Sequence, residues 1–190
     1  DDNIEWPAYG GSAGGGHYSR ATEITKNNVA DLAQAWQHRS GDFRQGNNAL
    51  FDESGNDDAQ SPTAFAVTPL MVEDTVYYCT SFNRVFALAP DTGAEKWVFD
   101  PKVDMADEGL TNCRGVSSWV DAENPDAFCG HRILLGTLDG RIFALDGATG
   151  KRCPDFGDNG EISLSLGLTK HEALEYQITS APAMIGDLVG

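Results

Sequence analysis

The stretch ALAPDTGAEKW at residues 87–97 returns in outline as ALDGATGKRCP at residues 144–154. Both copies contain the pattern Ala-Leu-x-x-x-Thr-Gly, and their first residues lie 57 positions apart. A repeat of this period indicates a fold built from one recurring supersecondary unit, as in solenoids and propellers. The two copies therefore have to be explained together with the segments that flank them.

A pair of strands is predicted before each copy. Four runs rich in β-branched and aromatic side chains form these pairs, at residues 75–81 with 84–90 and at residues 132–138 with 141–147. Their turns are Phe82-Asn83 and Asp139-Gly140, and an Asp-Gly dipeptide between such runs is the strongest short signal for a β-hairpin. The Thr-Gly turn after each hairpin lets the next strand double back, because glycine can adopt a positive φ.

Further strands complete the repeating unit. Proline-led or turn-led strands are expected at residues 68–74, 94–100 and 180–190. Trp36 and Trp97 occupy similar places 61 residues apart, whereas the position expected for a third tryptophan holds Pro154. A unit of four short strands, with a tryptophan packed between neighbouring units, is typical of the blades of a β-propeller. The alternative is two unrelated hairpins with ordinary turns.

We therefore expect an all-β chain that forms one partial β-propeller domain over residues 1–190. Its expected parts are an N-terminal loop and closing strand (1–40), a polar loop (41–62), a first blade (63–105), a second blade with an insertion (106–179) and the start of a third blade (180–190). A closed propeller needs at least four blades, so the chain is expected to be a piece of one. Single helical turns are expected at residues 28–32, with Asn28 as N-cap, and at residues 170–176.

Charge and hydropathy exclude several classes of protein. The formal net charge is −16, which argues against an electrostatic nucleic-acid binder. No run of about 18 apolar residues is present, so no membrane-spanning helix is expected. The first residues lack the basic and apolar regions of a signal peptide. The chain is therefore expected either to begin after a processed segment or membrane anchor, or to be cytosolic.

The four cysteines stand at positions 79, 113, 129 and 153, and none forms a C-x-x-C pair, which argues against a zinc or thioredoxin-like site. In an oxidising compartment the preferred pair is Cys113 with Cys129, which closes a loop rich in Pro, Asp and Asn. Cys79, in a central strand, is then expected to stay a buried thiol. Spacing alone supports free buried thiols equally well, because cysteine also behaves as a small hydrophobic residue.

Common motifs for other chemistries are missing from the sequence. The glycines of residues 10–16 follow no strand and do not form G-x-G-x-x-G, so they are interpreted as turn glycines and not as a Rossmann motif. The acidic residues 52–58 lack the ligand spacing of an EF-hand. His171 and Glu175 have helical i, i+4 spacing, but a solvated helical turn explains them better than a metal site.

Four stretches resemble the N-terminal part of a dehydrogenase that depends on pyrroloquinoline quinone (PQQ): residues 6–42, 68–104, 112–119 (NCRGVSSW) and 176–189 (YQITSAPAMIGDLV). The membrane-associated glucose and quinate dehydrogenases are the most similar branch. The resemblance implies a W-motif propeller, of whose eight blades about two lie in this chain. It also implies PQQ beside a calcium or magnesium ion, oxidation of a sugar, polyol or alcohol, and a quinone or cytochrome as electron acceptor. A periplasmic, membrane-associated location of the full-length protein follows from the same resemblance.

The resemblance also assigns three cofactor contacts. Arg114 matches a family arginine that pairs with PQQ, whose three carboxylates suit a guanidinium fork; without the resemblance, a surface or interblade arginine would be the simpler interpretation. Thr179 matches a family hydroxyl that contacts PQQ, and Leu110 is the residue nearest to the PQQ plane. Two departures weaken the match. Ala66 stands where family members usually carry a glutamate, and Leu110 stands where they place a histidine, another polar residue or a vicinal disulfide against the PQQ plane.

The family's catalytic aspartate and its metal ligands lie beyond residue 190, so residues 1–190 alone are expected to be inactive. The leading interpretation is a fragment of a PQQ-dependent dehydrogenase. Arg114 favours it, whereas Ala66 and Leu110 favour a non-catalytic propeller scaffold, the main alternative. A third interpretation is self-association, in which several copies complete a ring through their exposed blade edges.

Overall fold

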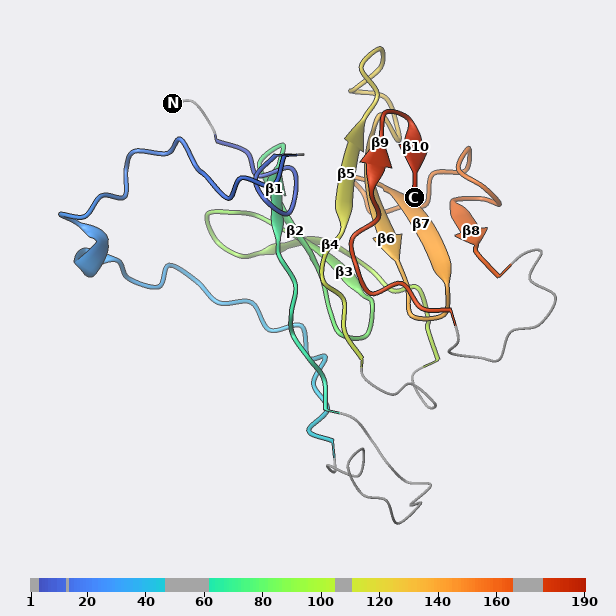
Figure 1. Ribbon diagram of the computed structural model, residues 1–190, viewed down its shortest axis with the longest axis horizontal. Helices are drawn as coiled ribbons and strands as arrows, with labels where there is room; N and C mark the ends of the chain where they lie inside the picture. Colours follow the sequence, from blue (N-terminus) through green and yellow to red (C-terminus); the bar gives the residue numbers. More distant parts are fainter. Residues whose placement is uncertain (1–3, 13, 47–61, 105–110, 166–175) are drawn as a thin grey trace.

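A computed structural model describes residues 4–12, 14–46, 62–104, 111–165 and 176–190 of the chain. Two four-stranded antiparallel sheets stand side by side, and a two-stranded hairpin follows them at the C-terminal end (Figure 1). The only helical element in the described part is one short 3-10 turn. The all-β prediction is therefore confirmed.

The first sheet contains four sequential strands in the order β1-β2-β3-β4. They are β1 (Leu70–Val72), β2 (Thr75–Cys79), β3 (Val85–Leu88) and β4 (Glu95–Phe99). Each strand lies inside a run that the sequence predicted as extended. Asn83 makes the predicted polar turn between β2 and β3 with a φ of 59°, and Gly93 supplies a φ of 70° between β3 and β4.

The second sheet repeats this arrangement in the order β5-β6-β7-β8. Its strands are β5 (Ser117–Val120), β6 (His131–Gly136), β7 (Arg141–Asp146) and β8 (Glu161–Ser163). All four strands of this second sheet are present. The backbone of Ala144 on β7 makes two hydrogen bonds to the outer segment. Its carbonyl accepts the N–H of Cys153, and its N–H donates to the carbonyl of Gly160. Residues 154–159 are thus an insertion in the outer strand, and Pro154 falls at its start.

The third copy of the unit forms a hairpin and not a single strand. β9 (Met184–Ile185) and β10 (Leu188–Val189) pair with each other across a turn at Gly186. The main core lies between the two four-stranded sheets, which both contribute buried side chains. Its largest members include Leu70, Tyr77 and Val85 from the first sheet and Ile133, Leu135 and Phe143 from the second.

Trp97 links the two sheets. Its ring packs on the Thr-Gly turn of the second sheet, where a Cβ on Gly150 would lie 2.6 Å from the indole. The indole N–H donates to the carbonyl of Gly147 at 2.8 Å. Trp97 is half-buried. The predicted position between two blades is confirmed, with part of the ring still exposed.

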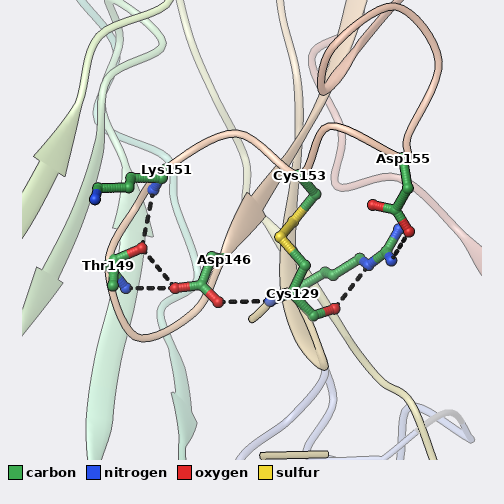
Figure 2. The surroundings of a disulfide bond; sticks show 7 residues. Cys129, Asp146, Thr149, Lys151, Cys153 and Asp155 are labelled. Carbon is green, nitrogen blue, oxygen red and sulfur yellow. Dashed lines mark hydrogen bonds and ion pairs between the residues drawn. A yellow bond between two sulfur atoms is a disulfide. The ribbon is translucent and has the colours of Figure 1, made fainter. Parts of the chain in front are cut away.

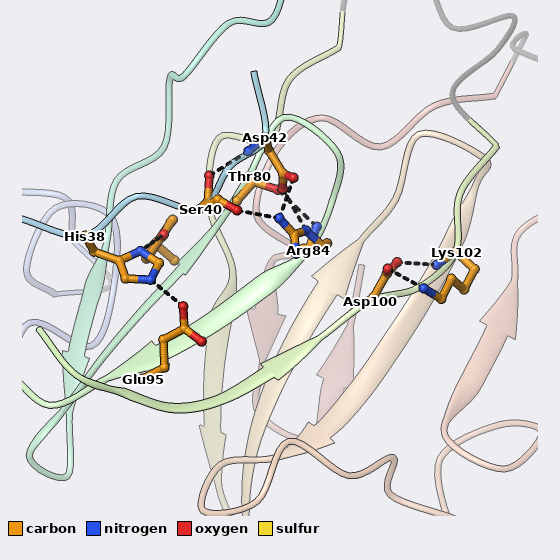
Figure 3. A network of polar contacts seen from close by, with 9 residues as sticks. His38, Ser40, Asp42, Thr80, Arg84, Glu95, Asp100 and Lys102 are labelled. Carbon is orange, nitrogen blue, oxygen red and sulfur yellow. Dashed lines mark hydrogen bonds and ion pairs between the residues drawn. The ribbon is translucent and has the colours of Figure 1, made fainter. Parts of the chain in front are cut away.

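Residues 36–42 lie against the first sheet without forming a strand. The expected closing strand around Trp36 is therefore wrong within the described part of the chain: the backbone of residues 33–46 forms no ladder with any described strand, and side chains hold it instead. Figure 3 shows Asp42 next to Arg84 of the first sheet, with Arg84 Nε 2.9 Å from the Asp42 carboxylate. His38 lies between Glu95, at 2.7 Å, and Tyr78.

The segment before Trp36 loops away from the sheets and returns to them (Figure 1). It contains η1 (Val29–Asp31), for which Asn28 occupies the N-cap position as expected. The Asn28 side chain does not cap that turn; its oxygen accepts the backbone N–H of Thr25, which precedes it. The helical turn expected at residues 170–176 falls almost entirely outside the described residues.

The cysteines form two disulfides that differ from the predicted pairing. Cys79 is bonded to Cys113, and Cys129 is bonded to Cys153, with Cα–Cα distances of 5.9 and 5.7 Å. The predicted Cys113–Cys129 bridge is wrong, and so is the prediction that Cys79 stays a thiol. Cys113 precedes β5 and faces the first sheet, whereas Cys129 lies near the other end of the second sheet, beside the Asp146–Cys153 turn (Figure 2). Loop length could not reveal these opposite positions.

Candidate cofactor site

The three units meet at Arg114. Its backbone N–H donates to the carbonyl of Thr179 at 2.9 Å, and its carbonyl accepts the N–H of Thr68 at 3.0 Å. Thr68 leads into β1, Arg114 into β5 and Thr179 into β9, so each residue stands just before the first strand of its unit. The entrances to the three units therefore converge on one residue.

The Arg114 side chain is exposed and carries an unusual set of neighbours. Its Nη1 lies 3.4 Å from the hydroxyl oxygens of Thr179 and Ser180. The other arginines within the two sheets all form ion pairs with carboxylates: Arg84, Arg132, Arg141 and Arg152. Arg114 forms none with any described residue. In a chain with a net charge of −16, a guanidinium left among hydroxyl groups is suited to an anion from outside the chain.

A pocket of about 430 Å³ opens beside this guanidinium. It is lined by Tyr9, Ala66, Thr68, Leu70, Arg114, Gly115, Val116, Ser180 and Ala181. Small residues leave space in the pocket. A Cβ on Gly115 would already lie 3.4 Å from the Ala181 methyl group. The pocket thus combines one cation, several hydroxyl groups and small apolar side chains. This donor set fits an organic ligand that carries carboxylates.

Tyr9 reaches the pocket from a separate N-terminal loop. Trp6 anchors this loop by exchanging two backbone hydrogen bonds with Met71 of β1, at 2.7 and 3.0 Å. Its indole N–H donates to the Tyr9 carbonyl at 3.3 Å, and its ring covers Gly11, which has a φ of 79°. The turn glycines expected in this stretch therefore let the loop fold back on Trp6 beside the pocket.

The structure brings two of the three predicted contacts together. Arg114 and Thr179 are neighbours, and Ala66 lines the same pocket, whereas Leu110 lies outside the described residues. Sequence reasoning missed Thr68, Ser180 and Tyr9. A signal for the first two was present, since both stand one or two positions before the proline that leads a predicted strand.

A second polar cluster links the sheets away from this pocket. The buried His131 ring at the start of β6 lies 2.9 Å from the Glu73 carboxylate in the β1–β2 turn. Its other nitrogen lies 2.9 Å from the Ser118 hydroxyl on β5. Among the described residues, no group of three or more His, Cys, Asp or Glu side chains is arranged to hold a metal ion. We therefore interpret the cluster around His131 as a contact between units.

Comparison with known proteins gives a consistent family. The profile described as "PQQ: Glucose/ethanol/alcohol dehydrogenase, beta-propeller domain" matches residues 6–189. The chain is 32% identical to a quinate/shikimate dehydrogenase (quinone) of Acinetobacter baylyi, over 98% of this chain and 23% of the relative. It is 37% identical to quinoprotein glucose dehydrogenase A of Acinetobacter calcoaceticus, over 84% of this chain and 20% of the relative.

Solved structures support the same fold. The crystal structure of the quinohemoprotein alcohol dehydrogenase from Comamonas testosteroni superposes with a TM-score of 0.70 at 25% identity. That match covers 100% of this chain and 23% of the alcohol dehydrogenase. The chain thus spans between a fifth and a quarter of the length of the relatives it matches. The two sheets correspond to part of a quinoprotein propeller.

Proposed function

The chain belongs to the family of PQQ-dependent dehydrogenase β-propellers, and from this premise we propose that it forms part of a quinoprotein that oxidises a sugar, a polyol or an alcohol. The electrons pass on to a quinone or a cytochrome. Residues 1–190 supply one wall of the cofactor pocket. The catalytic base and the ligands of the calcium or magnesium ion belong to other blades of the complete protein.

The observation that carries this proposal is the guanidinium of Arg114. It stands where three units converge, next to two hydroxyl groups, and no described carboxylate neutralises it. PQQ is a flat quinone with three carboxylates, so an arginine fork and hydroxyl donors match its edge. The small residues Ala66, Gly115 and Ala181 leave room for its ring system.

The bound PQQ supplies a two-electron oxidant, which is what the conversion of a CH–OH group to a carbonyl requires. The residues of this chain hold and orient it. Arg114 binds a carboxylate, and the hydroxyl groups of Thr179 and Ser180, 3.4 Å from its Nη1, add polar contacts at the same place. Leu110, the third contact that the resemblance assigns, lies outside the described residues, and its role beside the ring stays a proposal.

We place the complete protein in the periplasm, associated with the membrane. Two disulfides support this proposal, because disulfides persist in oxidising compartments and are rare in the cytosol. Within the described ranges, the structure contains no helix that is long and apolar enough to cross a membrane.

The test is a titration of the complete apoprotein that carries this chain with PQQ. The quenching of the protein's intrinsic fluorescence measures the binding. Arg114→Ala is expected to raise the Kd for PQQ about tenfold or more, because it removes a charge-assisted hydrogen bond. Arg152→Ala is the matched control, since Arg152 pairs with Glu161 outside the pocket. Unchanged PQQ affinity in Arg114→Ala would overturn the site. Reduction of a dye with glucose, quinate or glycerol then identifies the substrate class.

A scaffold without catalysis is the second candidate. Ala66 favours it, because it leaves the cofactor pocket without the glutamate that the family usually has there. The same titration separates the two functions. A scaffold predicts that the unaltered complete protein binds no PQQ and reduces no dye with any of the three substrates.

A further inference from the structure

We infer that the Cys79–Cys113 disulfide is a positioning element that holds Arg114 in the direction needed to bind the cofactor. The inference rests on the proposed function, since it assigns a role within the same pocket. Cys113 directly precedes Arg114 in the chain, and Cys79 is the last residue of β2. The bond therefore joins the residue that precedes Arg114 in the chain to the first sheet.

The disulfide crosses from one sheet to the other. Cys79 belongs to the first sheet, and Cys113 leads into the second, and both belong to the main core between the sheets. The two side chains are 0% and 3% exposed. A covalent bond in this place restricts how far the start of β5 can move relative to the first sheet.

Other anchors near Arg114 are weaker than a covalent bond. Its backbone is held by one hydrogen bond on each side, to Thr68 and to Thr179. Before the disulfide, the Thr111 carbonyl accepts one N–H from Ala64. The buried side-chain oxygens of Thr111 and Asn112 have no hydrogen-bond partner in the part of the chain that the structure describes. The disulfide is thus the strongest described link between the segment that carries Arg114 and the first sheet.

Direction matters for this contact. A guanidinium binds a carboxylate through two parallel N–H groups, so its affinity depends on orientation as well as charge. A side chain that is fixed before the ligand arrives loses less freedom on binding. Removal of the disulfide should therefore weaken PQQ binding through Arg114, even where the fold survives.

The second disulfide provides a matched control. Cys129 precedes β6 and Cys153 lies between β7 and β8, so their disulfide joins two parts of the second unit (Figure 2). Neither residue lines the pocket. Cys129 is further tied by its N–H to Asp146 and by its carbonyl to Arg132. The bond joins parts of one unit, whereas Cys79–Cys113 joins two units. Its removal should reduce stability without changing the orientation of Arg114.

The experiment compares two double variants of the complete protein, Cys79→Ala/Cys113→Ala and Cys129→Ala/Cys153→Ala. Fluorescence titration of the apoproteins with PQQ is the main readout, and thermal unfolding reports the loss of stability. We expect about a tenfold higher Kd for the first variant and less than about a twofold change for the second, with both Tm values lowered. Equal effects on the Kd overturn the inference.

A cycle with Arg114→Ala tests whether the disulfide acts through that residue. In the Arg114→Ala background, loss of the Cys79–Cys113 bond should change the Kd by less than about twofold, because the contact it orients is already gone. An undiminished tenfold effect in this background contradicts the inference. If the unaltered protein binds no PQQ, the proposed function fails as a whole. If the unaltered protein binds PQQ and the two double cysteine variants have the same Kd for PQQ, the proposed function stands and this inference fails.

A further measurement covers the case in which the first double variant does not fold. Cys129→Ala/Cys153→Ala, which within residues 1–190 keeps only Cys79 and Cys113, is titrated with PQQ after expression under reducing conditions and again after oxidation. We expect tighter binding after oxidation, in proportion to the disulfide recovered by peptide mapping. Equal affinity of the reduced and oxidised protein, with the disulfide shown to have formed, overturns the inference.

Discussion

Trp97 of the first sheet lies across Gly150 of the second, close enough that a Cβ on the glycine would come within 2.6 Å of the indole. Trp36 lies across Gly93 in the same way, at 2.4 Å. Both glycines have a φ of 70° and belong to the repeated Thr-Gly turn. A tryptophan from one unit that packs on the Thr-Gly turn of the next is therefore the recurring contact between units.

Replacing Gly150 by alanine should lower the free energy of unfolding by weakening the contact between the two sheets. The variant places a methyl group in the left-handed region, which costs about 1–2 kcal/mol, and also forces Trp97 to move, which costs about 1–3 kcal/mol more. Gly186→Ala is the control, because it has a φ of 59° but no described atom within 4 Å of a new Cβ. Urea unfolding of the complete protein should show the larger loss for Gly150→Ala. Equal losses would mean that the ring contact contributes nothing.

The disulfides can be tested without any substitution. Protein exported to an oxidising compartment, alkylated without reductant and digested should yield two cross-linked peptide pairs. One pair contains Cys79 and Cys113, and the other contains Cys129 and Cys153. A Cys113–Cys129 peptide would contradict the structure and restore the pairing that the composition of the intervening loop predicts.

The repeat made the fold predictable, because its turn residues have local causes. Gly93 and Gly150 adopt a positive φ that few other residues accept, so their spacing marks the units directly in the sequence. The cysteine pairing has no such local cause. Cys79 and Cys113 meet only because two sheets stack side by side, and sequence separation carries no information about which sides face each other.

The candidate site was predictable only in part for the same reason. Arg114 and Thr179 followed from a resemblance to known dehydrogenases, residue by residue. Thr68 and Ser180 reach the pocket because the entrances of three units converge, which is a property of the assembled sheets. Tyr9 arrives from a loop that pairs with β1 outside the regular order of strands. The prolines after Thr68 and Ser180 mark the entrances of their units, but no pattern within one segment predicts that these entrances meet Tyr9 at one pocket.

Stability should fall at high pH because of Tyr77. Burial, with a smaller contribution from the Glu73 charge, raises the pKa of Tyr77 to about 12, and its hydroxyl donates to the Gly147 carbonyl. In the unfolded chain a tyrosine titrates near pH 10, so the folded state keeps a proton that the unfolded state releases. The stabilisation is complete below about pH 10 and is lost as the pH rises towards 12, by about 2–3 kcal/mol at most.

The variant Tyr77→Phe should reduce this loss, and the remainder should come from Tyr78, whose pKa burial also raises to about 12. The Gly147 carbonyl, which accepts from the Tyr77 hydroxyl, keeps a hydrogen bond in this variant because the Trp97 indole N–H also donates to it. Unfolding midpoints of the complete protein between about pH 9 and 12 provide the measurement. Tyr18→Phe is the control, since the Tyr18 side chain is 79% exposed. Parallel curves for the unaltered protein and Tyr77→Phe would show that another group causes the alkaline loss.

Salt should weaken PQQ binding through Arg114. The guanidinium is exposed at the pocket and no described carboxylate pairs with it, so its attraction for an anion is open to screening. Between about 0.01 M and 1 M salt the Debye length falls from about 30 Å to about 3 Å, and the Kd for PQQ should rise about fivefold. Arg114→Ala should bind less tightly at low salt and show a clearly smaller salt dependence. Arg114→Lys separates charge from geometry, because it keeps the salt dependence and still loses affinity without the planar fork. If Arg114→Ala retains the full salt dependence, the anion is bound by other cations of the complete protein and Arg114 is not its partner.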